Sequence, residues 1–256
     1  MGVSLYCQLY IAHNQFSKVK LDLLVIAAHP DDAELGCGGT IVKHLEAGKK
    51  VGVVDLTRGE LGTRGTPEIR DAEAKEAAKI LGLTVRENLG LADGYFQNVK
   101  VDQLKVVEAI RKYQPEIVLA NAVYDRHPDH GRASELIYDS CFLAGLPKVE
   151  TIWNGKSQSA WRPKAIYHFI QSRALTPDVV VDVSEFWETK MKAVLAYKSQ
   201  FHDPASKEPS TFISSPQFLK MVEARGVEYG QIIGAQYGEG YTVRKAVGVK
   251  SLFDIF

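Results

Sequence analysis

The sequence is poor in cysteine. Its three cysteines, Cys7, Cys37 and Cys141, are odd in number and far apart, and no CxxC pair occurs. A disulfide framework needs an even set of cysteines at regular spacings, so this pattern argues against the disulfide-rich class of secreted proteins. We therefore expect a protein of the reducing cytoplasm.

The chain also lacks an excess of charge of either sign. Its 256 residues include 31 Lys and Arg residues and 31 Asp and Glu residues, so the formal net charge is zero. Proteins that bind nucleic acid normally carry a basic excess, and this balance argues against that function. No apolar run approaches the length of a membrane span. The hydrophobic fraction of 45% is ordinary for a globular protein.

The first twenty residues differ from the rest. Val3 to Ala12 are mildly apolar, but Gln8 interrupts them and no Lys or Arg precedes them, unlike in a signal peptide. We predict an N-terminal extension of unknown role over residues 1–20 and a single domain over residues 21–256. The chain is long enough for one large α/β domain with a sizeable core.

Strand-like and helix-like segments alternate along the first half of the chain. Apolar runs of strand length, with helical spacing between them, occupy residues 21–28, 51–56, 85–89 and 117–120. This alternation predicts an α/β fold, a Rossmann-like three-layer sandwich with a mostly parallel sheet. The second half is less regular: strands are predicted at residues 165–170 and 179–183, and helices at 185–197 and 216–228.

Two histidine motifs each follow one of these strands. His29 and Asp32 belong to the stretch HPDDAE after the first strand, and His127 and His130 to HPDH after the fourth. Ligands of open α/β sheets bind beyond the carboxyl ends of the strands. If the fourth strand is the returning strand of a doubly wound sheet, it neighbours the first. The two motifs then face each other across one crevice.

These residues can supply a catalytic metal site. Such a zinc site usually has three protein ligands of the imidazole or carboxylate kind and one open position. His29, Asp32 and either His127 or His130 satisfy that count. The remaining histidine could stabilise an oxyanion or protonate a leaving amine, with Asp129 orienting it. Fe²⁺ or Co²⁺ would accept the same ligands.

Asp31 need not bind the metal, and a carboxylate in this place is a natural general base for water. Either motif alone could simply be a helix N-terminus with an aspartate cap. The alternative function is therefore a non-catalytic, Rossmann-like sugar-binding protein. The occurrence of both motifs after strands of one predicted sheet favours the metal site.

With these motifs, the chain resembles the LmbE-like (PIG-L) deacetylase family, which removes acetyl groups from N-acetylglucosamine conjugates. The resemblance rests on HPDDAELGCGGT (residues 29–40) and the distal HPDH, and it extends over about Leu21 to Phe256. The stretches LTRGELGTRGTPEIR, DRHPDHGRASELI and AYKSQF resemble the bacterial subfamily that makes the glucosaminyl-malate precursor of bacillithiol.

The resemblance implies zinc-dependent hydrolysis of the acetamide of an N-acetylglucosaminyl conjugate, N-acetylglucosaminyl-malate in the first place, by a homo-oligomer. It also implies residue roles. The metal ligands are His29, Asp32 and His130; Asp31 is the general base; His127 assists at the tetrahedral intermediate with Asp129 as its partner; Arg70 positions the substrate.

Further substrate-binding candidates lie in the Gly-rich loop after the second strand. Arg64 and Glu60 could hold a sugar or a carboxylate there, although a solvated loop is as well supported. Arg64 and Arg70 flank a predicted helix N-terminus, which is a favourable place for an anion. This favours a malate conjugate over free N-acetylglucosamine. A chitooligosaccharide and a mycothiol-type precursor are the alternative substrates for the same metal site.

Overall fold

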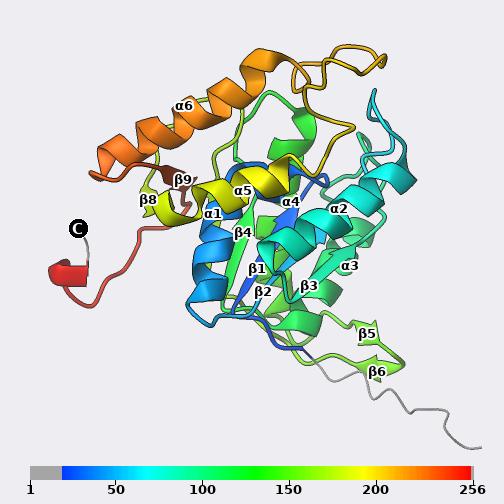
Figure 1. Ribbon diagram of the computed structural model, residues 1–256. Helices are drawn as coiled ribbons and strands as arrows, with labels where there is room; N and C mark the ends of the chain where they lie inside the picture. Colours follow the sequence, from blue (N-terminus) through cyan, green and yellow to red (C-terminus); the bar gives the residue numbers. More distant parts are fainter. Residues whose placement is uncertain (1–18, 255–256) are drawn as a thin grey trace, which may run out of the picture.

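A computed structural model describes residues 19–254, which form an α/β structure around one seven-stranded sheet (Figure 1). The strand order is β3-β2-β1-β4-β7-β9-β8. β9 runs antiparallel to both of its neighbours, and the other pairings are parallel. The predicted α/β fold with a mostly parallel sheet is confirmed. The strands are β1 (Leu23–Ala27), β2 (Val51–Asp55), β3 (Val85–Asn88), β4 (Ile117–Ala120), β7 (Ala165–Phe169), β8 (Val179–Asp182) and β9 (Gly238–Thr242).

Helices cover both faces of the sheet, and each face has its own apolar core. Alternate residues of β1 enter the two cores, Leu24 and Ile26 on one side and Leu23 and Val25 on the other, because successive side chains of a strand point to opposite faces. α6 crosses one end of the molecule, above α5 in the view of Figure 1. One face carries α1 (Asp32–Glu46), α2 (Pro67–Leu81) and α5 (Trp187–Val194). The other face carries α3 (Lys100–Tyr113) and α4 (Pro128–Ala144). The helix α6 spans Pro216–Ile232.

Both ends of α2 carry favourable capping residues. The side chain of Thr66 accepts the backbone N–H of Ile69, Pro67 is the first helical residue, and Gly82 ends the helix with φ 78°. This left-handed conformation favours glycine. The caps fix where the loop after β2 ends, and this loop borders the candidate site.

The second half departs from the prediction in two places. β9 escapes prediction because Gly238, Glu239 and Gly240 give it neither an apolar run nor an alternating pattern. The hairpin of β5 (Ile152–Trp153) and β6 (Lys156–Ser157) is too short to show any period. The helix predicted at residues 185–197 begins as a 3-10 turn, η1 (Ser184–Phe186), and ends at Val194.

Most of the predicted N-terminal extension, residues 1–18, lies outside the described residues. Within residues 19–254, no helix is both long and apolar enough to cross a membrane. The C-terminal segment extends away from the sheet (Figure 1), and its Leu252 and Phe253 are 83% and 88% exposed. The homo-oligomer implied by the resemblance stays a prediction, which light scattering of the purified protein can test.

A buried ion cluster fastens α1 to the sheet. Arg86 on β3 donates to both carboxylate oxygens of Asp55 at 2.8 and 3.0 Å, and to Glu34 of α1 at 2.5 Å. Burial alone would lower the pKa of Arg86, but the charges of Asp55 and Glu34 outweigh burial and raise it well above the usual value. The cluster therefore holds α1, which carries Asp32, against β2 and β3.

We expect Arg86→Met to lower the free energy of unfolding by about 3–5 kcal/mol, because it leaves two buried carboxylates without their cation. Chemical denaturation of the two proteins measures the difference. Lys79→Met is the matched control, since Lys79 pairs with Glu76 on the exposed surface of α2 and such pairs contribute little. Equal stability of the two variants would contradict this role of the cluster.

Candidate active site

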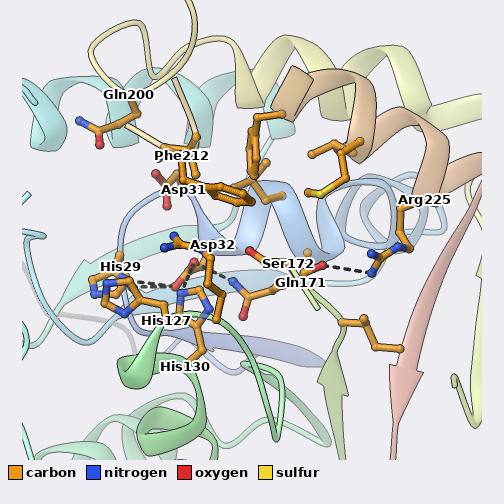
Figure 2. Close-up of a pocket in the computed structure, with 18 of the residues that line it drawn as sticks. His29, Asp31, Asp32, His127, His130, Gln171, Ser172, Gln200, Phe212 and Arg225 are labelled. Atoms are coloured by element: carbon orange, nitrogen blue, oxygen red, sulfur yellow. Dashed lines mark hydrogen bonds and ion pairs between the residues drawn. The ribbon is translucent and has the colours of Figure 1, made fainter. Parts of the chain in front are cut away.

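The two histidine motifs meet, as their positions after neighbouring strands predict. β1 and β4 are adjacent parallel strands. The ring centroids of His29, His127 and His130 lie 4.8, 5.1 and 5.7 Å apart, and Figure 2 shows the three rings grouped at one end of a cavity. Residues a hundred positions apart thus form one cluster at the carboxyl end of the sheet.

Asp32, the first residue of α1, joins this cluster. Its Oδ1 lies 3.1 Å from Nε2 of His130, and its Oδ2 lies 3.5 Å from Nδ1 of His29. All three side chains are buried. One nitrogen of each ring and a carboxylate therefore converge, as the predicted ligand set requires.

Carboxylates hold the opposite nitrogens of two of the histidines. Nε2 of His29 lies 3.0 Å from Asp93 and 3.2 Å from Asp129, and Nδ1 of His130 lies 2.5 Å from Asp125. A carboxylate in this place takes the ring proton and turns the lone pair of the other nitrogen toward a metal. The pattern favours His29 and His130 as ligands.

His127 is held differently. Its Nδ1 accepts the backbone N–H of Asp129 at 3.2 Å, which leaves the proton of a neutral ring on Nε2. Burial lowers the pKa of His127, and the neighbouring His29 and His130 lower it further. The ligand atoms of the three histidines all lie within 4.8 Å of one another, so proximity alone would also allow His127 as a ligand. The carboxylate pattern distinguishes His127 from the other two.

The electrostatic environment of the cluster favours a cation. Burial lowers the pKa of His130, but the carboxylates of Asp32 and Asp125 outweigh it and raise that pKa to about 9. The pKa of His29 likewise rises well above its usual value, because Asp129, Asp32 and Asp93 outweigh burial. Carboxylates that stabilise two imidazolium charges also stabilise a divalent ion. The donor set and its charge therefore fit a metal such as zinc.

Asp31 lies beside these residues in an unusual backbone conformation. Its φ is 111°, in a region that residues other than glycine rarely adopt. Burial raises the pKa of Asp31 to about 7, although the charge of Arg70 acts to lower it. A buried carboxylate that titrates near neutral pH is suited to accept a proton from water.

Arg70, the predicted substrate-positioning residue, donates its hydrogen bonds to the turn between β1 and α1 and to the loop after β2. Its Nη2 donates to Asp31 Oδ2 at 3.2 Å and to the carbonyl of Pro30, and its Nη1 donates to the carbonyl of Gly59 at 3.4 Å. A Cβ added to Gly59 would lie 1.9 Å from Nη1, so this loop packs directly on the guanidinium. Arg70 borders the cavity, but these contacts make it a positioning residue for Asp31.

Arg64 and Glu60, predicted to bind substrate, hold loops together. Arg64 is buried and donates from Nε to the carbonyl of Ser199 at 2.8 Å and from Nη2 to Ser206 Oγ at 2.9 Å. Glu60 is exposed, accepts the backbone N–H of Asp93 at 2.9 Å, and does not line the cavity. Arg64 does reach the cavity wall, but its charge is directed into the loop at residues 199–209.

Asp129 also differs from the expectation that its carboxylate would orient His127. The carboxylate contacts Nε2 of His29 and accepts hydrogen bonds from Arg132 at 2.6 Å and from the backbone of Gly94 at 2.9 Å. Only its main chain contacts His127. Asp129 therefore orients His29 through its side chain and His127 through its backbone.

Two amide side chains that sequence reasoning missed hold Asp32 in place. Asn121 donates to Asp32 Oδ2 at 3.0 Å. Gln171, labelled beside Asp32 in Figure 2, donates to Oδ1 at 2.8 Å. They follow β4 and β7, and Asp93 and Asp125 similarly follow β3 and β4. The strand-end rule that located the histidines could have found all four residues.

The cavity beside the cluster has a volume of about 470 Å³. Gln200 and Phe212, from the loop before α6, line it, whereas the nearby Tyr197 packs in a core. Arg126 lines it as well, with its guanidinium 4.3 Å from the ring centroid of Phe212. Among residues 19–254, no carboxylate forms an ion pair with Arg126, so its charge remains available to a ligand.

We expect Gln171→Ala to weaken the binding of a divalent metal by about 10–100-fold, because Asp32 Oδ1 loses the donor that fixes it. Competition with a chromogenic chelator measures the Kd for Zn²⁺. Asn98→Ala is the matched control, since that amide donates to Asp139 and does not line the cavity. An unchanged Kd in Gln171→Ala would show that Asp32 needs no such support.

Comparison with known proteins connects this geometry to a reaction. Residues 24–141 match the PIG-L family, described as GlcNAc-PI de-N-acetylase. The chain is 30% identical over 239 residues to the diacetylchitobiose deacetylase of Thermococcus kodakarensis, with 88% of this chain and 83% of that protein covered. It is 26% identical over 192 residues to a probable N-acetyl-alpha-D-glucosaminyl L-malate deacetylase 2 of Bacillus anthracis, with 70% and 81% covered.

One similar protein is named for a different reaction. The chain is 29% identical over 195 residues to the 4-oxalmesaconate hydratase of Pseudomonas putida, with 70% of this chain and 74% of that protein covered. Among solved structures, the conserved protein TT1542 of Thermus thermophilus matches with a TM-score of 0.80 and 37% identity, over 90% of this chain and 98% of that one. The fold is thus shared over nearly the whole described chain.

Proposed function

Because the chain belongs to the PIG-L (LmbE-like) family of N-deacetylases, we propose that it is a zinc-dependent hydrolase of the acetamide of N-acetylglucosaminyl-malate. The observation that supports this most strongly is the convergence of His29, Asp32 and His130, with carboxylates on the far ring nitrogens and Asp31 alongside. Fe²⁺ and Co²⁺ suit the same ligands and are the alternatives to zinc.

The residues divide the reaction between them. A divalent ion held by His29, Asp32 and His130 would polarise the acetamide carbonyl and lower the pKa of water to about 7. Asp31, held by Arg70, accepts the proton of the attacking water. His127 donates from Nε2 to the carbonyl oxygen as negative charge develops on it. The C–N bond then breaks, the amine nitrogen takes up a proton, and acetate leaves.

The two adjacent aspartates should respond differently to substitution. Asp31→Asn should keep the metal and lower kcat by about a hundredfold or more, since it removes only the base. Asp32→Ala should lose the metal itself. Elemental analysis and kinetics of both variants measure these outcomes. If Asp31→Asn were the variant that emptied the site, the two roles would be reversed.

For the malate moiety we propose Arg126 as the recognising cation, in place of Arg64 and Arg70. Arg64 and Arg70 direct their donors into protein loops and toward Asp31, whereas Arg126 lines the cavity without an ion-pair partner among the described residues and stacks on Phe212. Malate linked to the sugar offers carboxylates to a guanidinium, and free N-acetylglucosamine offers none. Arg126 also precedes His127 directly, and both residues line the cavity.

This assignment predicts a substrate preference. The wild type should favour N-acetylglucosaminyl-malate over free N-acetylglucosamine by about tenfold or more in kcat/KM, because one charge-assisted contact contributes about 1.5–3 kcal/mol. Arg126→Ala should remove most of that preference, whereas Arg70→Ala should slow both substrates alike.

Arg244→Ala serves as the control for charge, since Arg244 pairs with Glu135 and does not line the cavity. This variant should keep the preference. A wild type without any preference would refute the malate assignment and leave deacetylation of another N-acetylglucosamine conjugate.

The hydratase relative defines the rival reaction, addition of water to a carbon–carbon double bond. The proposal is separated from it by assaying acetate and free amine from the same protein preparation.

We also propose a cytoplasmic location, which the free, buried thiols of Cys37 and Cys141 support. Cell fractionation tests it.

A further inference from the structure

The cavity extends well beyond the catalytic cluster, along the inner face of α6. Figure 2 shows Arg225 of α6 on the opposite side of the view from His29. We call this part the apolar arm. It is lined by Leu35, Ile170, Trp187, Phe218, Met221 and Val222.

α6 presents one continuous face to the apolar arm. Phe218, Met221 and Val222 recur at the spacing of helical turns. Gly226 follows on the same face, where an added Cβ would lie 2.4 Å from the ring of Trp187. The helix thus rests on Trp187 at this point and walls the arm along the preceding turns.

The charged groups of the arm are already paired. Lys190 Nζ lies 2.7 Å from Glu239 Oε1, and both side chains are buried. The carboxylate of Glu239 also accepts the backbone N–H groups of Gly39 and Thr40. Arg225 donates to backbone carbonyls and lies near Glu228. A compartment with apolar walls and neutralised charges suits an uncharged apolar group.

The arm begins beside Asp32, one of the proposed metal ligands. Gln171 lines the cavity and donates to Asp32 Oδ1, and Leu35 and Gly36 follow Asp32 within the first turns of α1. In an amide, the acyl group is bonded directly to the reacting carbonyl carbon, whereas the sugar ring separates an aglycone from it. A compartment that starts beside Asp32 is therefore within reach of the acyl group.

We propose that the apolar arm holds the acyl chain of the substrate, and that the protein hydrolyses glucosamine amides with chains longer than acetyl. This rests on the proposed amidohydrolase function and extends its substrate class. The chemistry is unchanged: water adds to the carbonyl carbon, the C–N bond breaks, and the products are a carboxylate and a free amine. An acetyl methyl group would leave the arm empty.

A chain-length series tests the proposal. The metal-loaded, full-length protein is assayed for amine release from N-acetyl-, N-butanoyl-, N-hexanoyl- and N-octanoylglucosamine. Each fully buried methylene should raise kcat/KM about fourfold, which corresponds to about 0.8 kcal/mol. Allowing for incomplete burial, the hexanoyl amide should exceed the acetyl amide by about tenfold or more. Hydrolysis of the acetyl amide alone would overturn the proposal but leave deacetylation standing. Hydrolysis of neither the series nor N-acetylglucosaminyl-malate would overturn both.

Variants of α6 locate the chain. Val222→Trp fills the arm and should bring the hexanoyl-to-acetyl ratio down to about one. Met221→Gln keeps the side-chain length, adds polarity, and should lower the ratio about threefold or more. Val227→Trp is the matched control, because Val227 is 47% exposed and does not line the cavity; its ratio should match the wild type. Thermal melting of all three variants checks folding.

A final substrate separates the acyl chain from an apolar aglycone. Octyl N-acetylglucosaminide carries its chain on the sugar instead of the amide. A gain for this glycoside that Val222→Trp removes, with no gain along the acyl series, would overturn the acyl assignment. A gain confined to the acyl series supports it.

Discussion

The carboxylate of Asp32 is the group on which the candidate site depends. Its two oxygens lie beside one nitrogen of His29 and one of His130, and amides from Asn121 and Gln171 fix their directions. These partners come from the ends of β1, β4 and β7, which are neighbours in the sheet. A different strand order would separate them. The doubly wound topology is therefore the means by which one carboxylate gains four partners.

The charges around the histidines explain why the site suits a cation. Asp93, Asp125 and Asp129 hold ring nitrogens from behind, and Asp32 faces them from the front. Buried carboxylates are costly unless a positive charge lies near them. Arg132 neutralises Asp129, and Arg70 neutralises Asp31. The carboxylate of Asp32 is directed at the space between His29 and His130, where a metal ion would compensate its charge.

Local signals in the sequence predicted the elements and the meeting of the two histidine motifs, because apolar periodicity, caps and strand ends are encoded within a few residues. The roles of the arginines were beyond such reasoning. Arg64 and Arg70 appear in one short stretch, yet their partners are Ser199, Ser206 and Asp31, far along the chain or in another loop. Which arginine stays free for a ligand is decided by tertiary contacts, and Arg126 became a candidate only when those contacts were known.

The backbone of Asp31 has a consequence for how this protein can change. Glycine would adopt the same φ without strain, whereas an aspartate there costs on the order of 1–3 kcal/mol. The residue best suited to the turn between β1 and α1 is therefore unable to serve as a base. With Asp31 as the proposed base, selection for thermal stability and selection for turnover would act against each other at this one position. A variant with a higher free energy of unfolding must therefore gain that stability from substitutions in segments remote from the turn.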